Sequence, residues 1–194
     1  MLKPIKREFY NRHTVSVAKE LLGHFLVRKI GNDLIVGKIV EVEAYRGEDD
    51  PGSHAYRGVT PRTKIMFGEP GHAYVYLIYG IYYCLNVTTE PEGQAGAVLI
   101  RAVEPIQGIE IIKRNRKVDN LKNLTNGPAR VTMGFDIDKR FNGIDMTKYG
   151  PLFIAENPRK GNFEIVERPR IGIKVGLDKL WRFYIKGNPF VSKL

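Results

Sequence analysis

One carboxylate in an apolar segment is the residue of this sequence best placed to do chemistry. Glu43 lies in the run 34–45, where Glu41 and Glu43 alternate with valine and alanine. Alternate residues of a strand point to the same face, so the two carboxylates share a face. A single glutamate can activate a water molecule, and one carboxylate suffices when the leaving group departs readily. The competing interpretation is a solvated strand face, because glutamate is rarely buried without a partner.

A group of aromatic rings follows this carboxylate. It comprises Tyr74, Tyr76, Tyr79, Tyr82 and Tyr83 around a single glycine, Gly80. Tyr79 is expected near a turn, where a large exposed ring is costly unless it packs or binds. Inserted into a base stack, such a ring can fill the gap left by an extruded nucleotide, which inner rings can then sandwich. A hydrophobic core with hydrogen-bonded hydroxyls is the alternative for the inner rings.

Two isolated polar residues add to this group. His54 lies in a long polar segment, 46–71, where it could serve as a general acid, a stacking ring or a backbone donor, or could simply be exposed. Arg101 lies in the apolar run 97–103, and a guanidinium there needs an acidic partner. Glu43 and Glu104 are the natural candidates.

The loop 57–64 interleaves cations with hydroxyl and turn residues. Arg57, Thr60, Arg62 and Lys64 have the composition of a phosphate-contacting loop, although a merely solvated loop would look similar.

Length and charge set the class of protein. The 194 residues are most simply one domain, 1–194. Thirty-one lysines and arginines against 21 aspartates and glutamates give a net charge of +10, which favours a polyanionic partner, nucleic acid before an anionic membrane. The N-terminal residues lack the apolar core of a secretory signal, and the apolar runs are too short to span a bilayer. We therefore expect a cytoplasmic protein.

The cysteine and histidine counts argue against a metal centre. A lone cysteine, Cys84, excludes an internal disulfide, an iron–sulfur cluster and a four-cysteine zinc site. The four histidines show no metal-ligand spacing on one helix face, so a metal site is not expected.

The polar and apolar pattern predicts an α+β fold with a mostly antiparallel sheet and a few short helices. Strands are expected at 24–30, 34–45, 72–78, 82–89 and 97–103, and helices at 15–22, 106–116 and from Pro128 towards Gly134. Thr14 is the expected N-cap of the first helix, which Gly23 closes.

Several blocks of the sequence together resemble the alkyladenine (3-methyladenine) DNA glycosylase family. They comprise the loop of His54 and residues 40–45, 60–62, 70–71, 74–82, 84–86, 99–105, 126–128, 170–172 and 182–189, in the family's order and over nearly the whole chain. The resemblance implies a single domain built on a curved antiparallel sheet, with no cofactor.

The resemblance also implies catalytic roles. Glu43 matches the general base that deprotonates the water attacking the sugar C1′. Arg101 matches an arginine that positions this water, and Ile171 matches a residue whose backbone carbonyl does the same.

Recognition roles follow in the same way. Tyr45, His54 and Tyr76 match the rings that stack on the extruded base. Asn86 matches a residue at the base edge that disfavours the exocyclic amino group of guanine. Tyr79 matches the side chain that intercalates in the vacated position.

The expected function is a monofunctional glycosylase of base excision repair. It flips alkylated or deaminated purines out of double-stranded DNA and hydrolyses the N-glycosidic bond, as a nucleoid-associated monomer. Two alternatives remain: a non-catalytic reader of damaged or structured nucleic acid, and a bifunctional enzyme that also nicks the strand through a lysine Schiff base.

Overall fold

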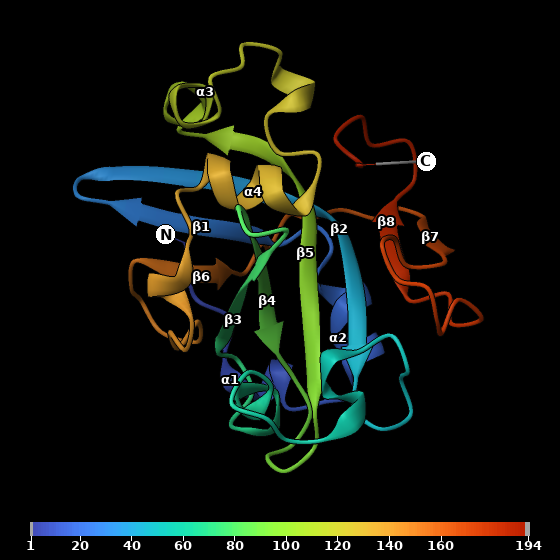
Figure 1. The fold of residues 1–194 in the computed structure, drawn as a ribbon. Coiled ribbons are helices and arrows are strands. Elements are labelled where there is room, and N and C mark those ends of the chain that lie inside the picture. The colour runs from blue at the N-terminus through green and yellow to red at the C-terminus, as the bar shows by residue number, and fades with distance from the viewer. Residues whose placement is uncertain (1, 193–194) are drawn as a thin grey trace.

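The computed structural model describes residues 2–192. Within this range eight strands form one antiparallel sheet in the order β3-β4-β5-β2-β1-β6, and β8 joins β2 on one side and β7 on the other. Figure 1 shows the sheet curling around the long central strands β2 and β5, with short helices against it. The predicted α+β class with a curved, mostly antiparallel sheet is confirmed.

The strands are β1 Phe25–Ile30, β2 Asp33–Arg46, β3 Ala73–Ile78, β4 Tyr82–Thr88, β5 Gly96–Gln107, β6 Leu152–Ala155, β7 Ile165–Arg168 and β8 Arg182–Ile185. The α-helices are α1 Arg7–Tyr10, α2 Thr14–Leu21, α3 Ile109–Arg116 and α4 Pro128–Gly134. Short 3-10 turns are η1 His54–Arg57, η2 Lys64–Phe67, η3 Leu121–Asn123 and η4 Lys139–Phe141.

Strand β2 carries both glutamates into the middle of the sheet. Near its centre it pairs with β5 on one edge and β8 on the other, and Glu43 is in register with Leu99 and Arg182. The pairing with β5 shifts register on both sides of Glu41, as at a β-bulge. Glu41 and Glu43 are both completely buried. The solvated-face interpretation of these carboxylates is therefore wrong.

Strand β5 is longer than its sequence pattern predicts. It continues to Gln107 through Pro105, which the ladder accommodates where the register shifts beside Gly37. Helix α3 consequently begins at Ile109 rather than at residue 106. Helix α4 begins at Pro128, so the proline lies in its first turn, as predicted.

The hairpin of β3 and β4 presents its turn to solvent. Tyr79 and Gly80 adopt left-handed backbone angles, with φ of 51° and 72°. A non-glycine residue in this region is uncommon, and here it turns the Tyr79 ring outwards, where 84% of the residue is exposed.

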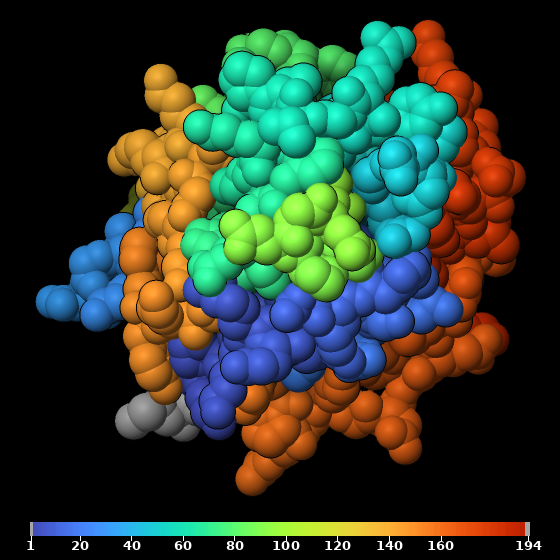
Figure 2. Space-filling model, turned by 90° about the horizontal axis from the view of Figure 1, so that it is seen from below, coloured from blue at the N-terminus to red at the C-terminus, as the bar shows by residue number. Residues whose placement is uncertain are grey.

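The expected capping of α2 by Thr14 is wrong. His13 occupies the N-cap position without a side-chain cap, and the Thr14 amide and hydroxyl donate to Oε1 of Glu90, at 2.8 Å and 2.7 Å. Glu90 is buried just after β4, in the segment that leads to β5, and it also accepts from Nε of Arg46 at 3.1 Å. Figure 2 shows this face, where the N-terminal segment (blue) lies against the segment near β5 (yellow-green).

Among residues 2–192, the helices are all too short or too polar to cross a membrane.

The carboxylate of Glu90 should stabilise the whole fold. We expect Glu90→Ala to lower the free energy of unfolding by about 1–3 kcal/mol, because the buried Thr14 donors lose their acceptor. Urea unfolding measures this change. Glu92→Ala is the control, since Glu92 is exposed, and should change stability by less than about 0.5 kcal/mol. Equal effects of the two substitutions would show that Glu90 does not anchor α2.

Candidate active site

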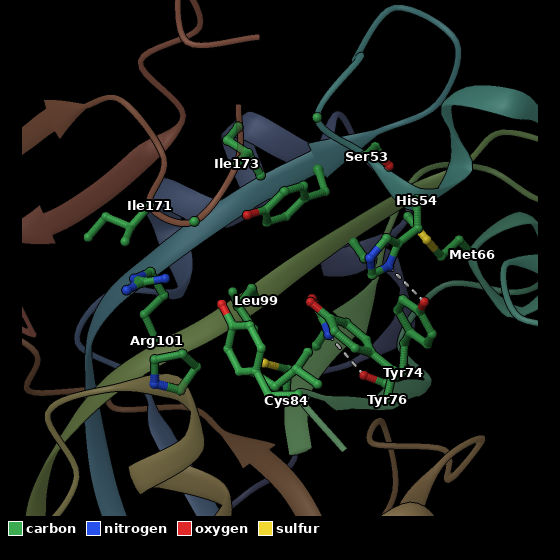
Figure 3. A pocket seen from close by; sticks show the side chains of 18 residues that line it. Ser53, His54, Met66, Tyr74, Tyr76, Cys84, Leu99, Arg101, Ile171 and Ile173 are labelled. Carbon is green, nitrogen blue, oxygen red and sulfur yellow. Dashed lines mark hydrogen bonds between the residues drawn. The ribbon is translucent and has the colours of Figure 1, made fainter. Parts of the chain in front are cut away.

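A cavity of about 320 Å³ opens beside the centre of β2 and β5. Figure 3 shows Arg101 and Ile171 at one end and His54, Tyr74 and Met66 at the other. The lining comprises Tyr45, Gly52, Ser53, His54, Met66, Tyr74, Tyr76, Ile78, Tyr79, Cys84, Asn86, Ala97, Leu99, Arg101, Pro128, Ile171, Gly172 and Ile173. Strands therefore supply the floor, and the loops after β2 and before β8 supply the rim.

Glu43 lies directly behind this lining and contacts three of its members. Its Oε1 accepts from the backbone N–H of Ile171 at 2.7 Å and lies 3.3 Å from Nη1 of Arg101. Its Oε2 accepts from the hydroxyl of Tyr45 at 2.7 Å. A carboxylate buried among three donors is an acceptor held in one orientation.

Burial and the three contacts of Glu43 shift its pKa in opposite directions. Burial raises its pKa above the usual value, whereas Arg101, the Ile171 amide and the Tyr45 hydroxyl oppose the rise. The same contacts act on the partners: the carboxylates Glu43 and Glu41 raise the pKa of Arg101 against its burial, and burial raises that of Tyr45. Both partners therefore remain protonated donors.

Arg101 bridges two carboxylates. Besides Glu43, its Nε donates to Oε1 of Glu41 at 3.2 Å, and Glu41 also accepts from Arg182 at 3.0 Å and from the amide of Ser192 at 2.7 Å. The predicted pairing of Arg101 with Glu43 is confirmed. Its alternative partner, Glu104, instead contacts Lys38 at 2.5 Å and Asn188, because β5 turns that side chain away from Arg101.

Aromatic rings form the opposite end of the cavity. Tyr74 and Tyr76 follow each other on one face of β3, with ring centroids 5.1 Å apart. His54 packs edge-on against Tyr76 at 4.7 Å, and its Nδ1 lies 3.1 Å from the hydroxyl of Tyr74. The guanidinium of Arg62 lies over the Tyr76 ring at 4.8 Å. The structure thus brings His54 and Tyr76 together, as expected.

His54 and Cys84, at this end of the cavity, are neutral near pH 7. Partial burial, with a smaller contribution from Arg62, lowers the pKa of His54 to about 4, although part of the residue remains exposed to solvent. Burial raises the pKa of the Cys84 thiol to about 11. A neutral imidazole is suited to stacking rather than to proton donation, and a thiol with a raised pKa is a poor nucleophile.

Asn86 and Tyr79 occupy different depths of the cavity. Asn86 is buried on β4, and its Nδ2 donates to the carbonyl of Tyr74 at 3.0 Å, which fixes the amide against the lining. Tyr79 lies at the rim on the exposed hairpin turn.

The expected phosphate-contacting residues lie outside the cavity. Arg57, Thr60, Arg62 and Lys64 are all exposed, and only Arg62 contacts the aromatic end. Thr60 is held in a turn by Thr63, whose hydroxyl lies 2.9 Å from its own.

Among residues 2–192, groups of three or more His, Cys, Asp or Glu side chains that could hold a metal ion are absent.

Comparison with known proteins places this geometry in a family. Residues 8–189 match the family model described as methylpurine-DNA glycosylase. A relative from Carboxydothermus hydrogenoformans is 50% identical over 193 residues, and the match covers 100% of both chains. Relatives from Clostridium acetobutylicum (50% over 200 residues, 97% of each chain) and Legionella pneumophila (47% over 195 residues, 99% of this chain and 100% of the relative) match equally broadly. All three carry the name "Putative 3-methyladenine DNA glycosylase".

The chain belongs to the methylpurine-DNA glycosylase family. It is accordingly a DNA-binding hydrolase of the 3-methyladenine glycosylase type, and the resemblance inferred from the sequence blocks is confirmed.

Sequence reasoning missed three charged residues around the glycosylase site. Strand alternation places Glu41 on the same face as Glu43, but it does not indicate that Glu41 contacts Arg101. Asp50 and Arg170 form a buried ion pair at 2.6 Å behind the cavity rim. The sequence signal for Arg170 is its place in the block 170–172, immediately before Ile171.

Burial of Glu43 in this glycosylase should make stability depend on pH. Because folding raises its pKa, the folded wild type keeps this proton over a pH range in which the unfolded chain has released it. Raising the pH through that range therefore removes stability from the wild type and not from Glu43→Gln.

We expect the stability of Glu43→Gln, relative to wild type, to increase as the pH rises above the ordinary pKa of a glutamate, about 4. Urea unfolding at several pH values gives this difference. Glu48→Gln, at an exposed site, should show no such trend. A difference that stays constant or declines would mean that the pKa of Glu43 is not raised.

Proposed function

We propose that this glycosylase flips alkylated and deaminated purines out of double-stranded DNA and hydrolyses the N-glycosidic bond with a water molecule activated by Glu43. The observation that carries the proposal is a fully buried carboxylate held by Tyr45, Arg101 and Ile171, all three of which line the cavity. The enzyme acts as a monofunctional glycosylase, as a monomer, in base excision repair.

Counting lone pairs supports Glu43 as the base. An ionised carboxylate offers about four acceptor sites; hydrogen bonds from Ile171 and Tyr45 occupy two, and Arg101 lies beside the group as an ion-pair partner. A remaining site accepts the proton of a water whose oxygen attacks C1′. The electron pair of the breaking bond goes to the departing base. Arg101 and the Ile171 carbonyl hold this water in the family-based assignment.

The aromatic end suits a flat heterocycle. A cavity of about 320 Å³ is at the small end of the range for small-molecule sites, which is appropriate for a single base. Tyr45, His54 and Tyr76 stack on this base, and Asn86 meets its edge, where it disfavours the exocyclic amino group of guanine.

The chemistry needs little acid catalysis for an alkylated purine. A 3-alkylated adenine carries a positive charge and leaves as a neutral molecule. The lowered pKa of His54 fits this requirement, because the imidazole is not protonated at neutral pH. Deaminated purines are neutral and need hydrogen bonds from the cavity to depart.

Recognition of duplex DNA uses the exposed rim. Tyr79, held outwards on the hairpin turn, inserts where the nucleotide has left, while Arg57, Thr60, Arg62 and Lys64 contact phosphates. The net charge of +10 supports a polyanionic substrate. A non-catalytic reader of damaged nucleic acid is less well supported, because a buried carboxylate beside the cavity costs stability and repels DNA.

The reaction is tested by replacing the proposed base. Glu43→Gln should bind alkylated duplex while releasing free base about 10²–10⁴-fold more slowly, because the water loses its proton acceptor. Single-turnover assays of free base measure this. Glu48→Gln should retain the wild-type rate.

Unchanged base release by Glu43→Gln would refute the assignment. A wild type that binds alkylated duplex without releasing base would support the reader. Borohydride trapping of a covalent adduct would instead support the bifunctional enzyme.

The intercalating role of Tyr79 has its own test. Because stacking of a base on an aromatic ring contributes about 1–3 kcal/mol, Tyr79→Ala should slow base release from alkylated duplex by about tenfold. Alkylated single strands leave no gap to fill and should react at the wild-type rate. Tyr149→Ala, at another exposed tyrosine, is the control. Equal slowing on duplex and single strand would argue against intercalation.

A further inference from the structure

A buried ion pair lies behind the cavity, outside the residues assigned to the reaction. Arg170 donates from Nη1 to Oδ2 of Asp50 and from Nη2 to Oδ1, both at 2.6 Å, and both side chains are completely buried. This bidentate geometry is strong and directional. It joins the loop after β2 to the segment before β8, 120 residues apart in the sequence.

The same guanidinium fastens its segment to β2 at the catalytic position. Nη1 of Arg170 also donates to the carbonyl of Ala44 at 2.9 Å, and the next residue, Ile171, donates its amide to Glu43. The amide of Ala44 in turn donates to the carbonyl of Trp181 at 2.9 Å. Two adjacent residues, Arg170 and Ile171, thus bond to two adjacent residues of β2, Ala44 and Glu43.

Asp50 organises the other side of the rim. Its Oδ2 accepts from the amide of Arg46 at 3.0 Å and its Oδ1 from that of Gly52 at 3.1 Å. Its carbonyl accepts from the amide of Ser53, directly before His54. A Cβ on Gly52 would lie 2.8 Å from Nη2 of Arg170, so this close approach requires glycine.

Arg170 also stacks on aromatic rings. Its guanidinium carbon lies 4.6 Å from the centroid of Tyr45 and 5.3 Å from that of Trp181. Tyr45 is the ring that both lines the cavity and donates to Glu43. The Arg170 guanidinium therefore contacts the Tyr45 ring and, through Asp50, the loop that carries His54. It also belongs to the residue next to Ile171, whose amide binds Glu43.

We propose that Arg170 and Asp50 form a positioning pair that sets the Ile171 amide on Glu43, the plane of Tyr45 and the loop carrying His54. The inference rests on the proposed function, because it assigns these three groups to one reaction. A purely structural pair would lower stability when broken without altering the chemistry of Glu43. The two roles therefore differ in the kinetics and in their dependence on pH.

The test is Arg170→Lys, which retains the charge and loses the planar fork. At saturating enzyme, release of base from alkylated duplex should slow by about 10²-fold, because small displacements of reacting groups are costly. The acidic limb of the pH profile should move to higher pH, because the Ile171 amide lowers the pKa of Glu43 and this bond is weakened. Asp50→Asn, which keeps the shape, serves as a second variant should Arg170→Lys fail to fold.

The matched control is Arg7→Lys. Arg7 pairs with Asp145 at 2.8 Å and donates to the carbonyl of Pro70, at a partly buried site away from the cavity lining. This variant should lose stability while keeping the wild-type rate and pH profile. Folded Arg170→Lys and Asp50→Asn proteins with wild-type rate and acidic limb, or a loss matched by Arg7→Lys, would overturn the proposal.

A second readout does not depend on activity. Trp181 is the single tryptophan of the chain and lies under Arg170. Its fluorescence emission should shift in Arg170→Lys and Asp50→Asn and stay constant in Arg7→Lys. If the wild type released no base, the proposed function would fail, while the emission shift would still report the pair. Unchanged emission in both variants would overturn the pair in either case.

Discussion

The structure around the cavity depends on keeping the Glu43 carboxylate, a hydrogen-bond acceptor, out of contact with solvent. A buried carboxylate is expensive unless its charge and its lone pairs are satisfied, and Glu43 is completely buried. Its three partners come from three parts of the chain. Tyr45 lies on the same strand, Arg101 on the neighbouring strand β5, and Ile171 in the segment before β8. The central position of β2, paired on both edges near Glu43, is what allows these parts to converge.

The charges around Glu43 form a row rather than an isolated pair. Arg101 lies between Glu41 and Glu43, and Glu41 also meets Arg182 and the amide of Ser192. In a low-dielectric interior, such a network is favourable only when every member is bonded. Two carboxylates, Glu41 and Glu43, and two guanidiniums, Arg101 and Arg182, thus balance in charge. The bulge at Glu41 brings a second carboxylate within reach of the same guanidinium.

The sequence could predict what depends on local spacing. Strand alternation placed Glu41 and Glu43 on one face, the lone cation in an apolar run required a carboxylate partner for Arg101, and the glycine beside Tyr79 marked the turn. The blocks of family resemblance then assigned roles that spacing alone could not distinguish from a hydrophobic core.

Contacts between residues far apart in the sequence could not be predicted from local spacing. Glu90 replaces a local cap at Thr14 from 76 residues away, and Asp50 meets Arg170 across 120 residues. A loop aspartate and an arginine near a strand look the same in sequence whether they are buried together or solvated. The extension of β5 through Pro105 was hidden for a related reason, since a register shift in the partner strand accommodates the proline.

The pair of Asp50 and Arg170 also bears on the proposed binding of a positively charged base in the cavity. Tyr45 and Tyr76 each have a guanidinium within 5 Å of the ring centroid, and a bare cation there would weaken the attraction of the ring for a second one. Asp50 neutralises Arg170 in a bidentate pair, and solvent screens the exposed Arg62. His54 remains uncharged. In the proposed mode of recognition, the aromatic faces therefore keep their attraction for an electron-poor purine, and the ion pair proposed to fix Tyr45 adds no net charge beside the ring.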